Sequence, residues 1–359
     1  MEIPGNSVNE IKRAEQVIPG ADHQRTSFTH DRVLSQVCIL WSSFSATGQA
    51  PMEGTVAQVV LVHGIGQQGS TAHEQLGCWL PSIVEGIRHS GHPAAGDVAA
   101  VLAPMASGAV IAAFYGDLFL RDGLQGGQEV ADPEAGAVAE ALALALLHSA
   151  AQQADPRIQA EARSILRQAD PSQAGAQGPL AAARGAMALL DGNAWLATRI
   201  FGLAERAMPN LLQVGRYLTE EQLHDKVQDR VASVISADTR VVVAHSLGSV
   251  VAWEACQRIE GSLPALITIG SPLGLDTVVY PRLRPAPPVF PTRVLHWVNV
   301  AHPDDIVAVV PRLAPLFPSK DSRQVEDHAP RSARDHHGAA TYLEQADVGR
   351  AVAEALRQT

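Results

Sequence analysis

The sequence predicts an α/β protein with a mostly parallel central sheet flanked by helices. Short runs of β-branched and other apolar residues recur along the chain, as expected of strands that are buried on both faces. Segments with apolar residues three and four positions apart lie between these runs, which is the spacing of amphipathic helices. Strands that alternate with helices in this way form parallel sheets, and such sheets bind ligands at the carboxyl ends of their strands.

The predicted elements follow one another in an order that defines three segments. Strands are predicted at 33–41, 56–62, 110–115, 239–244, 265–270 and 294–300, and helices at 74–90, 135–151, 158–168, 180–190, 211–217, 223–234, 250–259 and 342–357. Residues 1–55 form an N-terminal segment with a leading strand, and residues 56–125 and 235–359 form the α/β core. The Ala-rich residues 126–234, broken by Asp-Pro pairs, form a helical insertion, most simply a cap.

Composition narrows the classes of function. The 359 residues are 46% hydrophobic, enough for one large or two medium domains. The formal charge of −10 repels phosphate backbones and anionic lipid, so we expect no nucleic-acid partner. The three cysteines, Cys38, Cys78 and Cys256, have the spacing of neither a disulfide framework nor a zinc site. With no secretory signal visible at the start of the chain, this pattern predicts a reducing, cytoplasmic location.

The longest uncharged stretch, residues 98–115, is the candidate for a membrane span. Pro104 and Gly108 interrupt it, and it falls short of the roughly 20 residues that a spanning helix needs. We therefore expect no integral membrane span, and we interpret this stretch as a buried loop followed by a strand.

The sharpest chemical signal is the pentapeptide Ala244-His245-Ser246-Leu247-Gly248, which lies between a predicted strand and a predicted helix. A serine on so tight a turn needs small neighbours, and the turn aims its hydroxyl outward. The turn also places Ser246 at a helix N-terminus, where free N–H groups can stabilise an oxyanion. Ser246 is therefore the candidate nucleophile, and the Leu247 N–H is the candidate oxyanion donor.

Two motifs together resemble the α/β-hydrolase superfamily of lipases and esterases. His63-Gly64-Ile65-Gly66 resembles the early oxyanion loop of that superfamily, and residues 244–248 resemble its nucleophile elbow, with Ala244 in place of the usual first glycine. The resemblance implies an α/β-hydrolase fold. It also implies a second oxyanion donor at the N–H of Gly64 or Ile65, of which Ile65 is favoured.

Residues 270–274 and 299–308 are similar to the core of DDHD-type phospholipases, which carry an Asn, then His-Pro, then an acid one residue further on. This match implies Asp305 as the acid rather than Asp304, for which helix capping is the alternative. The family has proline where this chain has Ile306, and the overlap covers only part of the chain. The likeness supports serine hydrolase chemistry more firmly than a phospholipid substrate.

In this superfamily the base follows the acid along the chain, which leaves His328, His336 and His337. Residues 335–343 resemble the final catalytic loop of these hydrolases, in which a histidine precedes a Tyr-Leu pair at the start of the last helix. The resemblance favours His337 as the base, with His336 as the alternate.

These assignments predict an enzyme that hydrolyses carboxylic esters through an acyl-enzyme, with a small-molecule or lipid acyl ester as substrate. The mechanism requires neither a metal nor an organic cofactor. The same three residues would serve an acyltransferase, a thioesterase or a peptidase, and a non-catalytic scaffold of the same fold is a further alternative. The sequence does not predict the oligomeric state.

Overall fold

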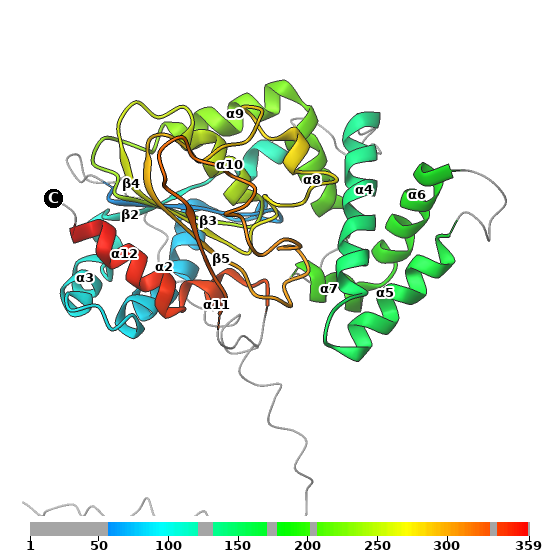
Figure 1. Cartoon of the computed structure of the whole chain (residues 1–359), viewed down its shortest axis with the longest axis horizontal. Coiled ribbons are helices and arrows are strands. Elements are labelled where there is room, and N and C mark those ends of the chain that lie inside the picture. Colours follow the sequence, from blue (N-terminus) through cyan, green and yellow to red (C-terminus); the bar gives the residue numbers. More distant parts are fainter. Residues whose placement is uncertain (1–56, 121–131, 171–177, 202–206, 331–335, 358–359) are drawn as a thin grey trace, which may run out of the picture. The chain divides into compact units, whose positions relative to one another are not determined.

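A six-stranded sheet, parallel throughout, forms the centre of the structure (Figure 1). The structure is a computed structural model that describes residues 57–120, 132–170, 178–201, 207–330 and 336–357. The strands are β1 (Val59–Val62), β2 (Val110–Ala113), β3 (Val241–His245), β4 (Leu263–Ile269), β5 (Val294–Val300) and β6 (Val325–His328), in the spatial order β2-β1-β3-β4-β5-β6. The predicted α/β class with a parallel sheet is confirmed. The leading strand predicted at 33–41 lies outside the described residues.

Apolar residues on both faces of the strands explain why the sheet is buried. All four residues of β1 and all seven residues of β4 are buried. Because successive side chains of a strand point to opposite faces, Val59 and Leu61 belong to one core layer and Val60 and Val62 to the other. A strand with this pattern needs helices on both faces of the sheet.

Helices cover both faces. The helices α2 (Ala72–His89), α3 (Ala95–Leu102) and α12 (Ala346–Arg357) supply the core layer of one face, and α9 (Glu221–Ala232) and α10 (Leu247–Cys256) contribute to the other (Figure 1). Thr71 caps α2 by accepting a hydrogen bond from the N–H of Glu74, which begins this helix two residues before the predicted start.

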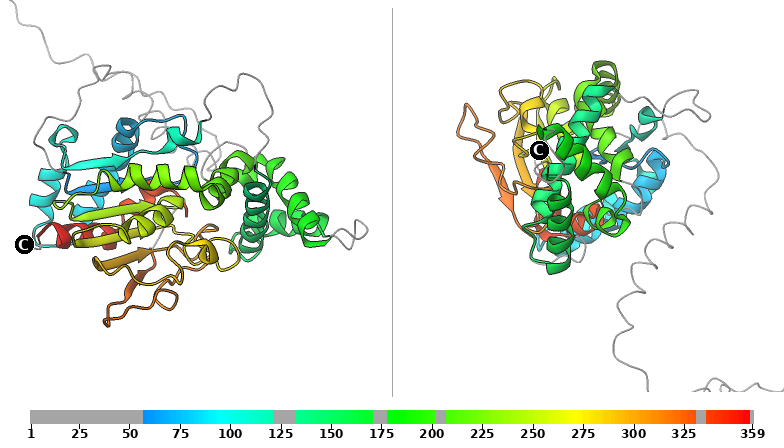
Figure 2. Two further views of the ribbon diagram at one scale, coloured as in Figure 1. Left: turned by 90° about the horizontal axis from the view of Figure 1, so that it is seen from above. Right: turned by 90° about the vertical axis from the view of Figure 1, so that its right-hand side faces the viewer.

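A group of helices lies at one end of the sheet (Figure 2). It comprises α4 (Pro133–Ala150), α5 (Pro156–Gln168), α6 (Gly178–Asp191), α7 (Ala194–Phe201) and α8 (Ala207–Thr219). Asp132 and Asp155 cap α4 and α5, each followed by a proline in the first turn. The Asp-Pro pairs at 132–133 and 155–156 thus begin helices, whereas the pair at 170–171 extends outside the described residues. These helices lie within the insertion predicted at 126–234. Helix α9 lies in the same range but packs against α10 of the α/β core, so the boundaries of the insertion stay a prediction.

Several elements differ from the sequence-based expectations, among them α7, a range for which no separate helix was predicted. Residues 95–102 form the helix α3, not the loop expected at the start of 98–115, because Val98, Ala99 and Leu102 share one buried face. The strand β6 was not predicted, since its residues, Val-Glu-Asp-His, are mostly polar. The final helix is divided into α11 (Ala339–Leu343) and α12. Short 3-10 turns, η1 (Met105–Ser107), η2 (Gly116–Phe119) and η3 (Tyr280–Arg282), complete the described elements.

The strand order places a ligand crevice beside β1 and β3. The chain moves from β1 to β2 on one side and then returns past β1 to β3 on the other side, so the direction of winding reverses there. Parallel sheets bind ligands at such a reversal, outside the carboxyl ends of the strands. The loops that leave β1 and β3 carry residues 63–67 and Ser246. Among the described residues, we find no helix with the length and apolar character needed to cross a membrane.

Candidate active site

Ser246 occupies a strained turn between β3 and α10. Its backbone has φ 53° and ψ −130°, a conformation that is rare for a residue with a side chain and costs about 1–3 kcal/mol. A Cβ atom at Gly248 would lie 2.4 Å from the carbonyl oxygen of Val62 and 2.3 Å from that of His63. The turn therefore needs glycine at position 248, because α10 starts directly against the end of β1.

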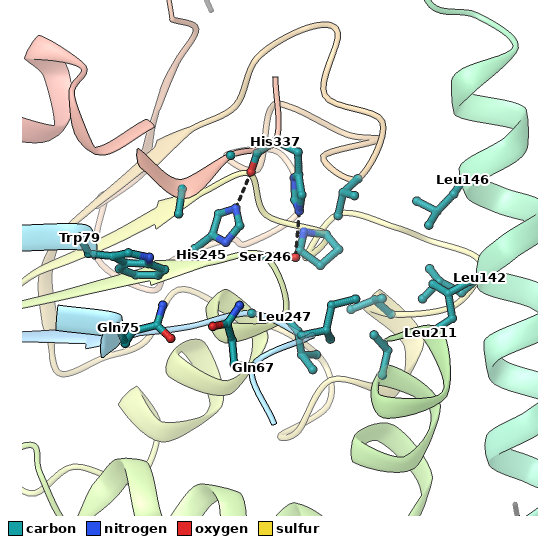
Figure 3. A pocket seen from close by; sticks show the side chains of 18 residues that line it. Gln67, Gln75, Trp79, Leu142, Leu146, Leu211, His245, Ser246, Leu247 and His337 are labelled. Atoms are coloured by element: carbon teal, nitrogen blue, oxygen red, sulfur yellow. Dashed lines mark hydrogen bonds between the residues drawn. The ribbon is translucent and has the colours of Figure 1, made fainter. Parts of the chain in front are cut away.

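A chain of hydrogen bonds joins Ser246 to His337 and Asp305. The Nε2 atom of His337 lies 3.1 Å from the Ser246 hydroxyl (Figure 3). Its Nδ1 atom lies 2.9 Å and 3.0 Å from the two carboxylate oxygens of Asp305. All three residues are buried. They come from the loops after β3 and β5 and from the segment before α11. The structure thus brings together the three residues that the sequence selected.

Asp305 is surrounded by donors. The Tyr342 hydroxyl donates to Oδ2 at 2.8 Å, and the Val307 N–H donates to Oδ1 at 2.8 Å. Burial by itself raises the pKa of this carboxyl, but His337, Tyr342 and Val307 outweigh burial and hold the pKa below its usual value. Asp305 is therefore ionised at neutral pH. Because it accepts from Nδ1–H of His337, a neutral His337 turns the lone pair of Nε2 toward the Ser246 hydroxyl.

Gly270, at the end of β4, gives the Asp305–His337 pair its space. It has a φ of +54°, in the region that favours glycine. A Cβ atom at this position would lie 2.9 Å from Oδ2 of Asp305, 3.0 Å from the Tyr342 ring and 3.2 Å from Nδ1 of His337. Only a glycine lets β4 pass this close beneath the pair.

The loop after β1 lies against Ser246, and His63 fixes its conformation. A Cβ atom on Gly64 would lie 2.8 Å from Cβ of Ser246. The N–H of Tyr115 donates to Nε2 of His63, so Nδ1 carries the proton and donates to the Gly64 carbonyl at 2.7 Å. Burial lowers the pKa of His63 to about 4, which keeps the ring neutral. The Gly64 carbonyl and the Ile65 N–H lie on opposite sides of the same trans peptide. Because the carbonyl is turned toward His63, the Ile65 N–H points away from His63.

His245, which precedes Ser246, supports His337. Its Nε2–H donates to the backbone carbonyl of His337 at 2.7 Å, and the two rings lie 4.7 Å apart between centroids. Burial, followed by the neighbouring His337, lowers the pKa of His245 to about 3. A permanently neutral His245 can donate this hydrogen bond without placing a second positive charge beside His337.

A cavity of about 190 Å³ opens onto Ser246. The predicted oxyanion residues Gly64, Ile65 and Leu247 line it together with His337. Leu247 is the first residue of α10, and the first N–H groups of a helix have no partner within the helix. The helices α4 and α8 contribute Leu142, Leu146, Leu211 and Val214 to the wall of the cavity. The cavity thus combines a buried hydroxyl, backbone donors and an apolar wall.

The other histidine and aspartate candidates lie apart from the hydrogen bonds to Ser246. The His336 ring stacks on that of His302, with centroids 4.2 Å apart and planes 6° apart. Asp304 donates its N–H to Nδ1 of His302 at 3.0 Å. His328, at the end of β6, lies 3.7 Å from Asp347 of α12. In the structure, His337 and Asp305 therefore form the hydrogen-bonded chain with Ser246, and the alternates His336, His328 and Asp304 do not.

One group of side chains among the described residues has the composition of a metal site. His302, Asp304 and His336 bring one ligand atom each within 4.8 Å of the others. The rings of the two histidines are stacked nearly parallel, so their in-plane lone pairs do not converge on one point, as metal ligands do. We assign this group to ring stacking, and the expectation that the chemistry needs no metal stays a prediction.

Several residues around this site had no role predicted from sequence. Tyr342 was noted only as part of a motif, and its contact with Asp305 depends on the fold of the loop after β5. The positive φ of Gly270 follows from the close approach of three distant segments. Gln213 of α8 accepts a hydrogen bond from the N–H of Gly66 at 3.1 Å and so ties the loop after β1 to the helical region. Among these residues, only Gly270 had a signal in the sequence, because it is a glycine directly after a predicted buried strand.

Comparisons of the chain with models of protein families, with curated proteins and with solved structures found no match.

Proposed function

We propose that this chain is a serine hydrolase of the α/β-hydrolase kind that cleaves carboxylic esters. The observation that carries the proposal is the hydrogen-bonded chain Ser246–His337–Asp305, at a strained turn that opens onto a cavity. The parallel sheet, with Ser246 directly after β3 at the reversal of winding, is compatible with that fold. Groups with this geometry activate a serine hydroxyl for attack on an acyl carbon.

The first half of the reaction uses His337 as a base. Nε2 of His337 takes the proton of the Ser246 hydroxyl while the oxygen attacks the ester carbonyl, and Asp305 stabilises the imidazolium that forms. His337 then gives this proton to the departing alcohol oxygen. The products are the free alcohol and an acyl group bound to Ser246. The low pKa of Asp305 suits this role, since a carboxylate that stays ionised attracts the cation.

Two backbone N–H groups form the proposed oxyanion hole. The N–H of Leu247 belongs to the unpaired first turn of α10. The N–H of Ile65 is the second donor, because His63 turns the Gly64 carbonyl away to the other side of that peptide. Gly64 allows this peptide to lie against Ser246. Each such donor contributes about 10²–10³ to the rate.

The second half of the reaction releases the acyl group. His337 takes a proton from water while the water oxygen attacks the acyl carbon of the acyl-enzyme. His337 then returns this proton to the departing Ser246 oxygen, which releases the carboxylic acid and restores the serine hydroxyl. An alcohol or thiol in place of water would give acyl transfer through the same groups. The ratio of acid to transferred product, measured with increasing concentrations of an added alcohol, separates hydrolysis from transfer.

The direct test is hydrolysis of p-nitrophenyl butyrate by the purified chain and by two serine variants. Ser246→Ala removes the nucleophile, and we expect kcat to fall about 10⁶-fold, the scale observed for other serine hydrolases. Ser262→Ala, at an exposed position between α10 and β4, is the matched control and should retain full activity. A folded native chain with no esterase activity, or a Ser246→Ala variant as active as the control, would reject the proposal in favour of a non-catalytic scaffold.

A further inference from the structure

Gln75, on the first turns of α2, places an amide with an unpartnered oxygen at the wall of the cavity. The residue is 5% exposed, and its Oε1 atom is fully buried with no hydrogen-bond partner among the described residues. Buried amide oxygens are nearly always paired, because an unpaired one loses its bonds to water and gains nothing in return. Because Gln75 lines the cavity that opens onto Ser246, this unpaired acceptor points to a hydrogen-bond donor that the ligand supplies.

The surroundings of Gln75 differ from the opposite wall of the cavity. Figure 3 shows Gln75, Gln67 and Trp79 on one side of Ser246, and Leu142, Leu146 and Leu211 on the other. Trp79 follows Gln75 by one helical turn and meets His245 edge to face, with ring centroids 6.0 Å apart. The cavity thus has an amide-lined side and a leucine-lined side, with the reactive hydroxyl between them.

A bound ester would span both sides, because its carbonyl carbon must lie at Ser246. An unsubstituted acyl chain is apolar and suits the leucine side of the cavity. Hydrogen-bonding groups placed on that side would be left unpaired. The alcohol portion must then extend toward Gln75. An amide both donates and accepts hydrogen bonds, as a hydroxyl does, so the two groups are complementary.

We propose that Gln75 forms a subsite for a hydroxyl of the alcohol portion of the ester, so that the substrates are apolar acyl esters of a polyhydroxy alcohol. This inference rests on the proposed function. It goes further by naming the substrate class and the orientation of the substrate. The Gln75 amide turns toward the cavity, the hydroxyl donates to its Oε1, and the acyl chain lies along the leucines of α4 and α8.

Three matched esters test the subsite in the native chain. Propyl butyrate lacks a free hydroxyl, 2,3-dihydroxypropyl butyrate carries hydroxyls on the alcohol, and propyl 3-hydroxybutyrate carries one on the acyl group. We expect kcat/KM to be at least about tenfold higher for dihydroxypropyl butyrate than for the other two, since hydrogen-bonding sites discriminate strongly against analogues that lack the bonding group. Equal values for all three esters would overturn the subsite. A preference for the hydroxylated acyl group would overturn the proposed orientation.

The variant Gln75→Met keeps the length of the side chain and removes the amide. Its kcat/KM for dihydroxypropyl butyrate should fall at least about tenfold, while the value for propyl butyrate stays within about twofold. Gln153→Met, at a buried glutamine that does not line the cavity, is the matched control and should keep the native preference. An equal loss on both esters in Gln75→Met would show a structural role only and would reject the subsite.

The outcomes also separate this inference from the proposed function. If the native chain cleaves propyl butyrate without a preference for hydroxyls, the proposed function stands and the subsite is rejected. If it cleaves neither the three esters nor p-nitrophenyl butyrate, both the proposed function and the subsite are rejected. Should Gln75→Met fail to fold, the substrate preference of the native chain still decides the question.

Discussion

Two Asp–His pairs lie one residue apart on the same two segments, and their surroundings differ. Asp305 and His337 are buried and joined to Ser246 by hydrogen bonds. Asp304 and His336 are half-buried, and His336 stacks on another histidine instead. The two pairs have the same residue types, so what distinguishes them is burial and the partners at each ring or carboxylate. In the proposed function, these surroundings make the inner pair the acid and the base.

Replacing each histidine in turn tests this comparison with the largest expected effect. His337→Ala removes the proposed base, so kcat for p-nitrophenyl butyrate should fall about 10⁶-fold. His336→Ala removes only a stacked ring and should change kcat by less than about threefold. Equal losses in the two variants would show that the inner and outer pairs do not differ in function.

The aspartates should show the same contrast on a smaller scale. Asp305→Asn keeps the shape of the side chain but no longer selects the productive tautomer of His337, so kcat should fall about 10⁴-fold. Asp304→Asn should be nearly silent. Thermal unfolding of both variants serves as the control for folding. A strongly impaired Asp304→Asn that unfolds normally would contradict the assignment.

Gly270→Ala tests how tightly the inner pair is packed. The added methyl would press on Asp305, Tyr342 and His337 at 2.9–3.2 Å, in a backbone conformation that alanine disfavours. We expect kcat to fall about 100-fold, the cost of displacing a reacting group by about 1 Å. Gly261→Ala, where a Cβ atom would meet nothing within 4 Å, should keep native activity. Native activity in both variants would show that this close approach is unimportant.

The buried histidines should make the fold sensitive to acid. The pKa of His63 is lowered to about 4 and that of His245 to about 3, whereas the unfolded chain binds these protons near pH 6.5. Stability is therefore unaffected above pH 6.5 and is lost as the pH falls toward the folded pKa values. Each histidine contributes about 1.4 kcal/mol per pH unit in this window.

Urea unfolding between pH 7 and pH 4.5 measures this effect. His245→Asn should reduce the slope of unfolding free energy against pH by about 1.4 kcal/mol per unit, or a factor of about ten in the equilibrium constant. An unchanged slope in His245→Asn would show that this ring is protonated in the folded chain.

Local patterns were enough to predict most of the sheet. The runs around β1, β3, β4 and β5 are rich in valine, isoleucine and leucine, and those of β1, β3 and β4 are followed directly by histidine, serine and glycine. The strand β6 was missed because it is an edge strand with polar residues, and only its pairing with β5 identifies it. The helix α3 was missed because the uncharged run 98–115 contains a proline and a glycine, which favoured a loop. The spacing of its apolar residues Val98, Ala99 and Leu102 indicates a helix instead.

Sequence motifs could select Ser246, Asp305 and His337 because each lies in a short pattern beside a predicted element. The sequence could not select the residues that hold them. Tyr342 contacts Asp305 across 37 positions of the chain, and His245 contacts the backbone of His337 across 92. Such contacts depend on where loops meet at the edge of the sheet, which no local pattern contains.

Labelling with a fluorophosphonate, followed by mass spectrometry of the peptides, tests the central claim most directly. The probe forms a covalent bond only with an activated hydroxyl, and we expect modification of Ser246 alone in the native chain. We expect no labelling of Ser246→Ala or His337→Ala, and native labelling of His336→Ala. A folded native chain that stays unlabelled, or one labelled at another residue, would contradict the claim that Asp305 and His337 activate Ser246.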